Sequence, residues 1–314
     1  MSSAMRVLVL GAGGTGGYFG GRLAQAGADV TFLVRPARAA LLRERGLRLR
    51  SPLGDADLDV AAVTADVLPS QPPFDLVVLS CKAYDLDSAM DAIAPAVGPA
   101  TSVLPILNGL LHYAALDARF SRARVPGGLC FISATLGAGG EVVHMGGPAS
   151  ITFGLREGNT DTGVLAQLAS SYAAAGVDHL LATDIAQAQW TKFSFLAALA
   201  AGTCLMRSSV GDIVASEGGE AFMAALHEEC LAVAAAEGQP VPDTEARIAR
   251  GHLTRVGSPV TASMLRDLQA GARVEALQIV GDMVHRAHRA GLAAPRLEAA
   301  WIHLQAYESA RTAG

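Results

Sequence analysis

A glycine-rich turn near the N-terminus constrains the fold of this chain more than any other feature. An apolar segment, residues 7–10, leads directly into Gly11, Ala12, Gly13, Gly14, Thr15 and Gly16. A segment rich in small apolar residues follows, and residues 30–34 form a second apolar run. This order predicts a strand, a turn, a helix and a strand, which is the arrangement of a dinucleotide-binding βαβ unit.

Each glycine of the turn has a physical purpose in such a unit. Gly11 permits the tight turn, Gly13 lets the backbone approach a pyrophosphate, and Gly16 lets the helix pack closely on the strands. The N–H groups and the dipole at the helix start then face the anion. Because glycine-rich loops also serve as plain structural turns, the prediction depends on the strands on both sides.

The residue after the second strand indicates which dinucleotide is preferred. An NAD site has an acidic residue there, which accepts a hydrogen bond from the ribose 2′-hydroxyl. This chain has Arg35, with Arg38 close behind, and no acid between Thr31 and Leu42. A guanidinium suits a 2′-phosphate, so we expect NADP(H) as the cofactor. The alternative is an arginine that is merely solvated in a loop.

Composition limits the classes of function. The 314 residues suffice for two domains, and the hydrophobic content of 51% fits a compact core and a possible homodimer interface. The net charge of −5 and the lack of a basic stripe argue against a nucleic-acid partner. The longest uncharged apolar stretch, Phe193–Met206, is too short to cross a membrane.

The four cysteines are far apart and form no CxxC pair. With no secretory signal before the first strand, they indicate reduced thiols in the cytoplasm. His285 and His288 form an HxxH pair without a cysteine or acidic ligand, so we expect no metal site.

The pattern of elements predicts an α/β protein with two domains. Residues 36–45 are expected to be a helix, and residues 47–50 a strand paired with 58–63. Buried strands are predicted at 75–80 and 101–107, and from Asp184 onward the chain is expected to be helical, beginning with a helix to about Leu205. We therefore predict an N-terminal Rossmann-like dinucleotide-binding domain, residues 1–180, and an all-α substrate and catalytic domain, residues 181–314.

Polar residues at predicted strand ends are the next candidates. Lys82 and Asn108 each follow a buried strand, and ligands of open parallel sheets bind at the carboxyl ends of the strands. Ordinary loop polarity is the alternative explanation for both.

The helical half contains one lysine, Lys192, which precedes fourteen residues without charge. Lysine is rarely buried without a partner or a task. A lysine in a cleft between the two domains could act as a general acid. The alternative is a lysine that extends its ammonium to solvent.

Taken together, these blocks resemble the ketopantoate reductases (2-dehydropantoate 2-reductases) over nearly the whole chain. The resemblance rests on GAGGTGGYFG at Gly11–Gly20, Arg35, CKAYD around Lys82, LNG at Leu107–Gly109, WTK at Trp190–Lys192, SML at Ser263–Leu265, and Glu275.

The resemblance implies an NADPH-dependent reduction of a 2-keto acid, 2-dehydropantoate, to a 2-hydroxy acid on the route to coenzyme A. Lys192 would be the general acid, Glu275 would lie at the cofactor and help to set the environment of Lys192, and Ser263 would meet the substrate carboxylate. The remaining implied contacts are Gly11–Gly16 and Arg35 with NADPH, and Lys82, Asn108 and Ala134 on the nicotinamide side, with Asn108 also near the substrate.

Three positions depart from the family pattern. Asparagines expected four and eight residues after the lysine are replaced by Leu196 and Ala200, and a third by Val210. Two other functions therefore stay open: a related NADP-dependent reductase of a less polar keto acid or imine, and a non-catalytic NADPH-binding redox sensor.

Overall fold

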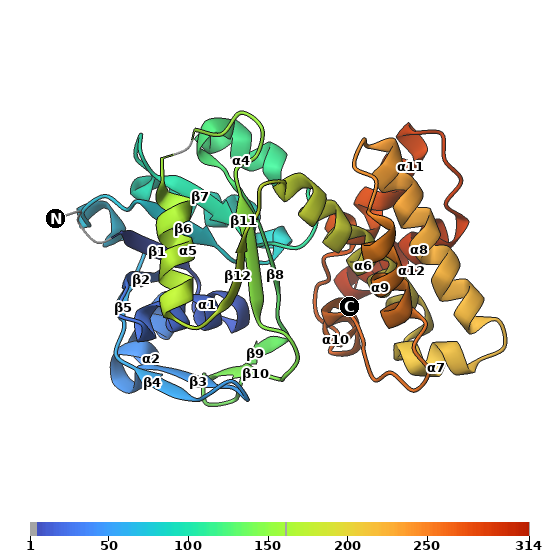
Figure 1. Cartoon of the computed structure of the whole chain (residues 1–314). Helices are drawn as coiled ribbons and strands as arrows, with labels where there is room; N and C mark the ends of the chain where they lie inside the picture. The colour runs from blue at the N-terminus through green and yellow to red at the C-terminus, as the bar shows by residue number, and fades with distance from the viewer. Residues whose placement is uncertain (1–4, 161, 314) are drawn as a thin grey trace. The chain divides into compact units, whose positions relative to one another are not determined.

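The computed structural model describes residues 5–160 and 162–313, and the chain divides into two compact units. The first unit comprises residues 1–107 and 112–185, and the second, the helical unit, comprises residues 108–111 and 186–314. In Figure 1 the strands lie in the part of the chain coloured blue to green, and the part coloured yellow to red contains helices.

The first unit is built on a five-stranded parallel sheet of order β5-β2-β1-β6-β7. Its strands β6 and β7 are buried at every residue, as expected for a parallel sheet covered on both faces. This sheet confirms the predicted Rossmann-like class. The elements are β1 (Arg6–Leu10), α1 (Gly14–Gln25), β2 (Asp29–Leu33), α2 (Pro36–Arg45), β5 (Ala61–Val63), β6 (Leu76–Leu79), α3 (Leu86–Ile93), β7 (Ser102–Pro105) and α4 (His112–Phe120).

Two smaller sheets complete the first unit. One has the order β4-β3-β10-β9 and the other β12-β11-β8, with α5 packed on β12. Their elements are β3 (Leu47–Arg50), β4 (Ala56–Leu58), β8 (Gly127–Phe131), β9 (Ala134–Leu136), β10 (Val142–His144), β11 (Ser150–Gly154), α5 (Val164–Ala174) and β12 (Asp178–Leu181). Short 3₁₀ helices are η1 (Leu68–Ser70), η2 (Ala83–Asp85), η3 (Ala94–Ala96) and η4 (Arg122–Arg124).

Two sequence-based expectations about the first unit need correction. The segment 58–63 is not one partner strand for β3: Ala56–Leu58 pairs with β3, whereas Ala61–Val63 joins the main sheet beside β2. The short apolar run is shared between two sheet edges, which its composition does not reveal. Helix α4 was not predicted, because its nine residues carry little periodic signal.

The helical unit confirms the all-α prediction for the C-terminal half. Its helices are α6 (Ile185–Met206), α7 (Val210–Ala215), α8 (Gly219–Ala236), α9 (Asp243–Leu253), α10 (Ser263–Gln269), a π-helix η5 (Leu277–Gly281) that continues as α11 (Asp282–Arg289), and α12 (Pro295–Ala313). Each of these helices contributes residues to its core. Among the residues that the structure describes, no helix combines the length and hydrophobicity that a membrane crossing requires.

His227 of α8 gives the helical unit an acid-sensitive core. Its side chain is 2% exposed, and burial lowers its pKa from 6.5 to about 4, with the charge of Arg250 adding to the effect. Between these two pH values the histidine is protonated in the unfolded chain but neutral in the folded chain. The contribution of His227 to the free energy of unfolding is therefore fully present above pH 6.5 and is lost as the pH falls toward 4. At pH 5 the free energy of unfolding should fall by about 2 kcal/mol from this group alone.

Denaturant unfolding of wild type and His227→Gln at pH 7.5 and pH 5 measures this effect. The variant should lose less stability on acidification than wild type, whatever its stability at pH 7.5. Equal losses in the two proteins would show that His227 does not carry the acid sensitivity.

Candidate active site

The glycine turn forms an open loop between β1 and α1. Gly11 has a φ of +85°, which favours glycine, and its N–H donates to the carbonyl of Leu33 at 2.9 Å. Helix α1 begins at Gly14 with Gly13 as its N-cap, and it has neither a side-chain cap nor an acidic residue in its first turn. The N-terminus of α1 is therefore suited to an anionic ligand.

Gly13 and Gly16 of this loop have different surroundings. A Cβ built on Gly16 would collide with Ser80 Oγ and with the carbonyl of Gly11, so glycine is needed for the helix to approach the strand ends. A Cβ on Gly13 would have no atom within 4 Å, so the space beside this residue is open. The two glycines thus differ in function: Gly16 serves packing, and Gly13 leaves room for a ligand.

Ala134 lies beside this loop, whereas its expected place on the nicotinamide side stays a prediction. A Cβ on Gly14 would be 2.5 Å from the carbonyl oxygen of Ala134, so the start of β9 runs along the first turn of α1. Thr15 is half-buried in the same turn. The hairpin of β9 and β10 therefore forms one side of the glycine loop.

The basic candidates of the first unit lie at strand ends. Arg35 is exposed and is the N-cap of α2, directly after β2. Lys82 is half-buried between β6 and η2. Arg38, in the first turn of α2, is half-buried and donates to the carbonyl of Ala12 at 2.8 Å. Sequence reasoning had noted Arg38 only as a second positive charge.

In the helical unit, Lys192 has an identified partner. Its side chain projects from α6 and is 9% exposed, and Nζ donates to Oδ1 of Asn108 at 3.1 Å. Asn108 comes from the short segment 108–111, which interrupts the first unit in sequence but belongs to the helical unit. A buried ammonium that bonds to an amide oxygen is consistent with a task in chemistry rather than an extension to solvent.

Gly109 lets the Asn108 segment pack closely on the carbonyl of Gln278. It has a φ of +77°, and a Cβ at this position would collide with the carbonyl oxygen of Gln278. Gln278 lies in the π-helix, and π-bulges occur frequently at functional sites. Glu275, which is 5% exposed, comes just before this helix. The candidate acid Lys192, its partner and Glu275 thus belong to one compact unit.

The expected substrate positions fall in different surroundings. Ser263 is the first residue of α10 and is half-buried. Leu196, one turn after Lys192, is also half-buried. Ala200 and Val210 are 0% exposed and belong to the core of the helical unit. The methyl group of Ala200 packs in this core, and the substrate contact expected at this position stays a prediction.

Sequence reasoning missed a charged group that packs on Trp190 of α6. The guanidinium of Arg286 lies 5.1 Å from the ring centre of Trp190 and bonds to Asp282 at 3.0 Å and to Glu237 at 2.6 Å. Burial raises the pKa of Asp282, which is 1% exposed. The i to i+4 spacing of Asp282 and Arg286 was the available signal.

The HxxH histidines have other neighbours. His288 contacts Glu298 at 2.7 Å, and His285 packs edge-on against the ring of Trp301. Within residues 5–160 and 162–313, no group of three potential metal ligands comes together.

Comparison with known proteins gives the same family for both halves. The family described as ketopantoate reductase PanE/ApbA matches residues 7–158, and its C-terminal counterpart matches residues 184–308. The chain is 34% identical to an oxidoreductase of Bacillus subtilis, YkpB, over 97% of this chain and 99% of that protein. It is 32% identical to the 2-dehydropantoate 2-reductase of Halobacterium salinarum, with 93% and 95% covered.

Solved structures agree with these matches. A ketopantoate reductase from Ralstonia eutropha superposes with a TM-score of 0.86 at 28% identity, covering 98% of this chain and all of that one. A D-mandelate dehydrogenase bound to NADH and anilino(oxo)acetate shares the fold, with a TM-score of 0.85 at 19% identity over 98% and 100% of the two chains. From the two family matches and the full-length relatives, we conclude that this chain is an oxidoreductase of the ketopantoate reductase family.

Proposed function

We propose that this protein reduces a 2-keto acid to a 2-hydroxy acid with NADPH, and that Lys192 is the general acid. The observation that carries the proposal is the bond from Nζ of the nearly buried Lys192 to Asn108. An ammonium held in this way can stabilise negative charge that develops on a carbonyl oxygen and can then donate its proton. A redox sensor without catalysis would have no use for such a group.

The geometry of the first unit supports a set of cofactor residues. The N–H groups at the start of α1 would bind the pyrophosphate, and Gly13 leaves the required space. The guanidinium of Arg35, at the end of β2, would bind the 2′-phosphate. When bound, NADPH supplies the hydride for the keto carbon.

The chain's own side chains would direct the rest of the reaction. Asn108 orients the Lys192 ammonium, and Gly109 lets the Asn108 segment pack closely against the π-helix. The hydroxyl of Ser263 would donate a hydrogen bond to the substrate carboxylate. Glu275 would help to set the charge environment of Lys192. Proton delivery to the keto oxygen then needs no residue beyond this set.

Ketopantoate is the first substrate that we propose, because relatives named 2-dehydropantoate 2-reductase match nearly the full chain. A specific observation favours a second candidate, a less polar 2-keto acid. Leu196 stands on α6 one turn after Lys192, where the family pattern has asparagine, and it cannot bond to a substrate hydroxyl. Sites that hydrogen-bond a hydroxyl discriminate strongly, whereas apolar sites do not.

Replacing Leu196 by asparagine tests this difference. We expect Leu196→Asn to raise the preference for ketopantoate over 3,3-dimethyl-2-oxobutanoate, which lacks only the hydroxyl, by about fivefold, since one hydrogen bond is worth on the order of 1 kcal/mol. Loss of NADPH absorbance with the two keto acids gives both values of kcat/KM.

The matched control is Leu196→Met, which keeps the position apolar and should leave the preference of wild type unchanged. If Leu196→Asn leaves the ratio of the two kcat/KM values unchanged, this position does not face the substrate. Wild-type turnover of ketopantoate with a kcat/KM of about 10⁴ M⁻¹s⁻¹ or more would favour the first candidate over the second.

A further inference from the structure

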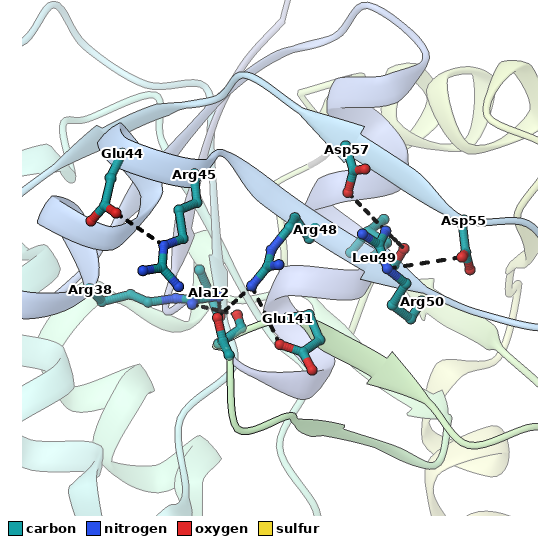
Figure 2. A network of polar contacts seen from close by, with 12 residues as sticks. Ala12, Arg38, Glu44, Arg45, Arg48, Leu49, Arg50, Asp55, Asp57 and Glu141 are labelled. Atoms are coloured by element: carbon teal, nitrogen blue, oxygen red, sulfur yellow. Dashed lines mark hydrogen bonds and ion pairs between the residues drawn. The ribbon is translucent and has the colours of Figure 1, made fainter.

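Arg38 joins the glycine loop to a distant turn of the first unit. Its Nη2 donates to the carbonyl of Ala12 at 2.8 Å, and its Nη1 donates to the carbonyl of Gly140 at 2.6 Å. Gly140 ends the turn 137–140 between β9 and β10. Figure 2 shows Arg38 reaching toward Ala12, with Arg48 and Glu141 beside it.

No carboxylate neutralises Arg38 in the described part of the chain, and its Nε–H has no hydrogen-bond partner there. Burial lowers the pKa of Arg38, and the nearby charge of Arg48 lowers it further. A half-buried guanidinium without a counterion is costly. A neutral aliphatic side chain at this position would avoid that cost but would make neither bond, to Ala12 or to Gly140.

The Ala12–Gly13 peptide is the point on which Arg38 acts. In a trans peptide the C=O of one residue and the N–H of the next point in opposite directions. Arg38 holds the carbonyl of Ala12 on the α2 side, so the N–H of Gly13 is directed to the other side. Among the described residues nothing accepts a hydrogen bond from this N–H, and the space beside Gly13 is open.

We propose that Arg38 is a positioning residue for the pyrophosphate: by fixing the carbonyl of Ala12, it presents the N–H of Gly13 to the ligand. The inference rests on the proposed binding of a dinucleotide by this loop. It assigns Arg38 a role different from that of Arg35. Arg35 would select for the 2′-phosphate, whereas Arg38 would support every ligand that carries the pyrophosphate.

Calorimetric binding of three ligands separates these roles. Arg38→Met keeps the aliphatic stem but removes both charge-assisted bonds. We expect it to lower the affinities for NADP⁺ and NAD⁺ by the same factor, about tenfold, which corresponds to about 1.4 kcal/mol of binding free energy. Binding of adenosine 2′-monophosphate, which has no pyrophosphate, should change by less than twofold. In turnover, KM for NADPH should rise while kcat is kept.

Arg48→Met is the matched control. Arg48 donates to the carbonyl of Gly139 in the same turn and lies 3.5 Å from Glu141, but no contact joins it to Ala12. Its replacement should leave dinucleotide affinity within about twofold of wild type. Arg38→Lys keeps the charge on a single nitrogen, which lacks the planar fork, and should restore affinity only in part.

Several results would overturn the inference. If Arg38→Met binds NADP⁺ and adenosine 2′-monophosphate more weakly but binds NAD⁺ with unchanged affinity, Arg38 is a direct ligand of the 2′-phosphate. Equal losses in Arg38→Met and Arg48→Met would assign the effect to the turn 137–140, and full rescue by lysine would assign it to charge alone. Unchanged binding in Arg38→Met would also contradict it. If wild type binds no dinucleotide, it is the proposed function that fails.

Discussion

Replacing Lys192 by alanine is expected to lower kcat by a factor of about 10² to 10⁴, the usual contribution of a positioned acid. The bond from Nζ to Asn108 would be lost, and no other described residue of α6 carries a positive charge. Cofactor affinity should stay within about twofold, because the glycine loop belongs to the first unit. Steady-state turnover and fluorescence titration with NADPH measure the two effects.

The control is Lys192→Arg, which keeps a positive charge that does not give up its proton near neutral pH. Its kcat should remain close to that of the alanine variant. Recovery of wild-type kcat with arginine would mean that Lys192 acts only through its charge. If Lys192→Ala keeps the kcat of wild type, Lys192 is not the general acid. If the wild-type protein binds NADPH but turns over no keto acid, the redox sensor is favoured.

The sequence makes a direct observation of Lys192 possible. The chain has only two lysines, Lys82 and Lys192. After reductive methylation with ¹³C-formaldehyde, an NMR spectrum should therefore show two lysine signals, and Lys192→Arg identifies one of them. The titration of that signal gives the pKa of the proposed acid in the folded protein.

Replacing Arg35 by serine is expected to weaken NADPH binding by about 10- to 100-fold and to leave NADH binding within about twofold. The physical reason is the loss of charge-assisted bonds to a 2′-phosphate, each worth about 1.5 to 3 kcal/mol. Fluorescence titration of both reduced cofactors gives the ratio of affinities.

Arg43→Ser is the matched control, because Arg43 is an exposed arginine on the same helix α2. Its removal lowers the net charge by the same amount and should leave the NADPH to NADH preference unchanged. If Arg35→Ser loses affinity for NADPH and NADH to the same extent, or if Arg35→Ser and Arg43→Ser change the NADPH to NADH preference equally, Arg35 does not select the cofactor.

The order of elements was predictable because local signals agree with the fold. The glycine turn, the apolar strands and the start of α6 were read from residues that are neighbours in sequence. The sequence did not predict that residues 108–111 belong to the helical unit, because this depends on the packing of Gly109 against Gln278, far along the chain. Long-range contacts of this kind leave no periodic pattern.

The candidate site also contains features that the sequence predicted and features that depend on long-range packing. Arg35 follows from its place after a strand, whereas the contact of Arg38 with Ala12 depends on how α2 folds back toward the loop. The family resemblance placed Ala200 near the substrate, and the structure adds that its methyl group packs in the helical core. Spacing gives the face of a helix, and only the packing of the neighbouring helices decides which part of that face stays accessible.

The most direct test of the account is the fate of deuterium from NADPH labelled at C4 of the nicotinamide. Wild-type protein would be incubated with ketopantoate and with 2-keto acids that carry apolar side chains, and each product would be examined by mass spectrometry and NMR. The account predicts a 2-hydroxy acid with deuterium at C2 from at least one of them, and none with Lys192→Ala at matched times. Absence of labelled hydroxy acid from every keto acid, in protein that binds NADPH, would contradict the proposed reaction.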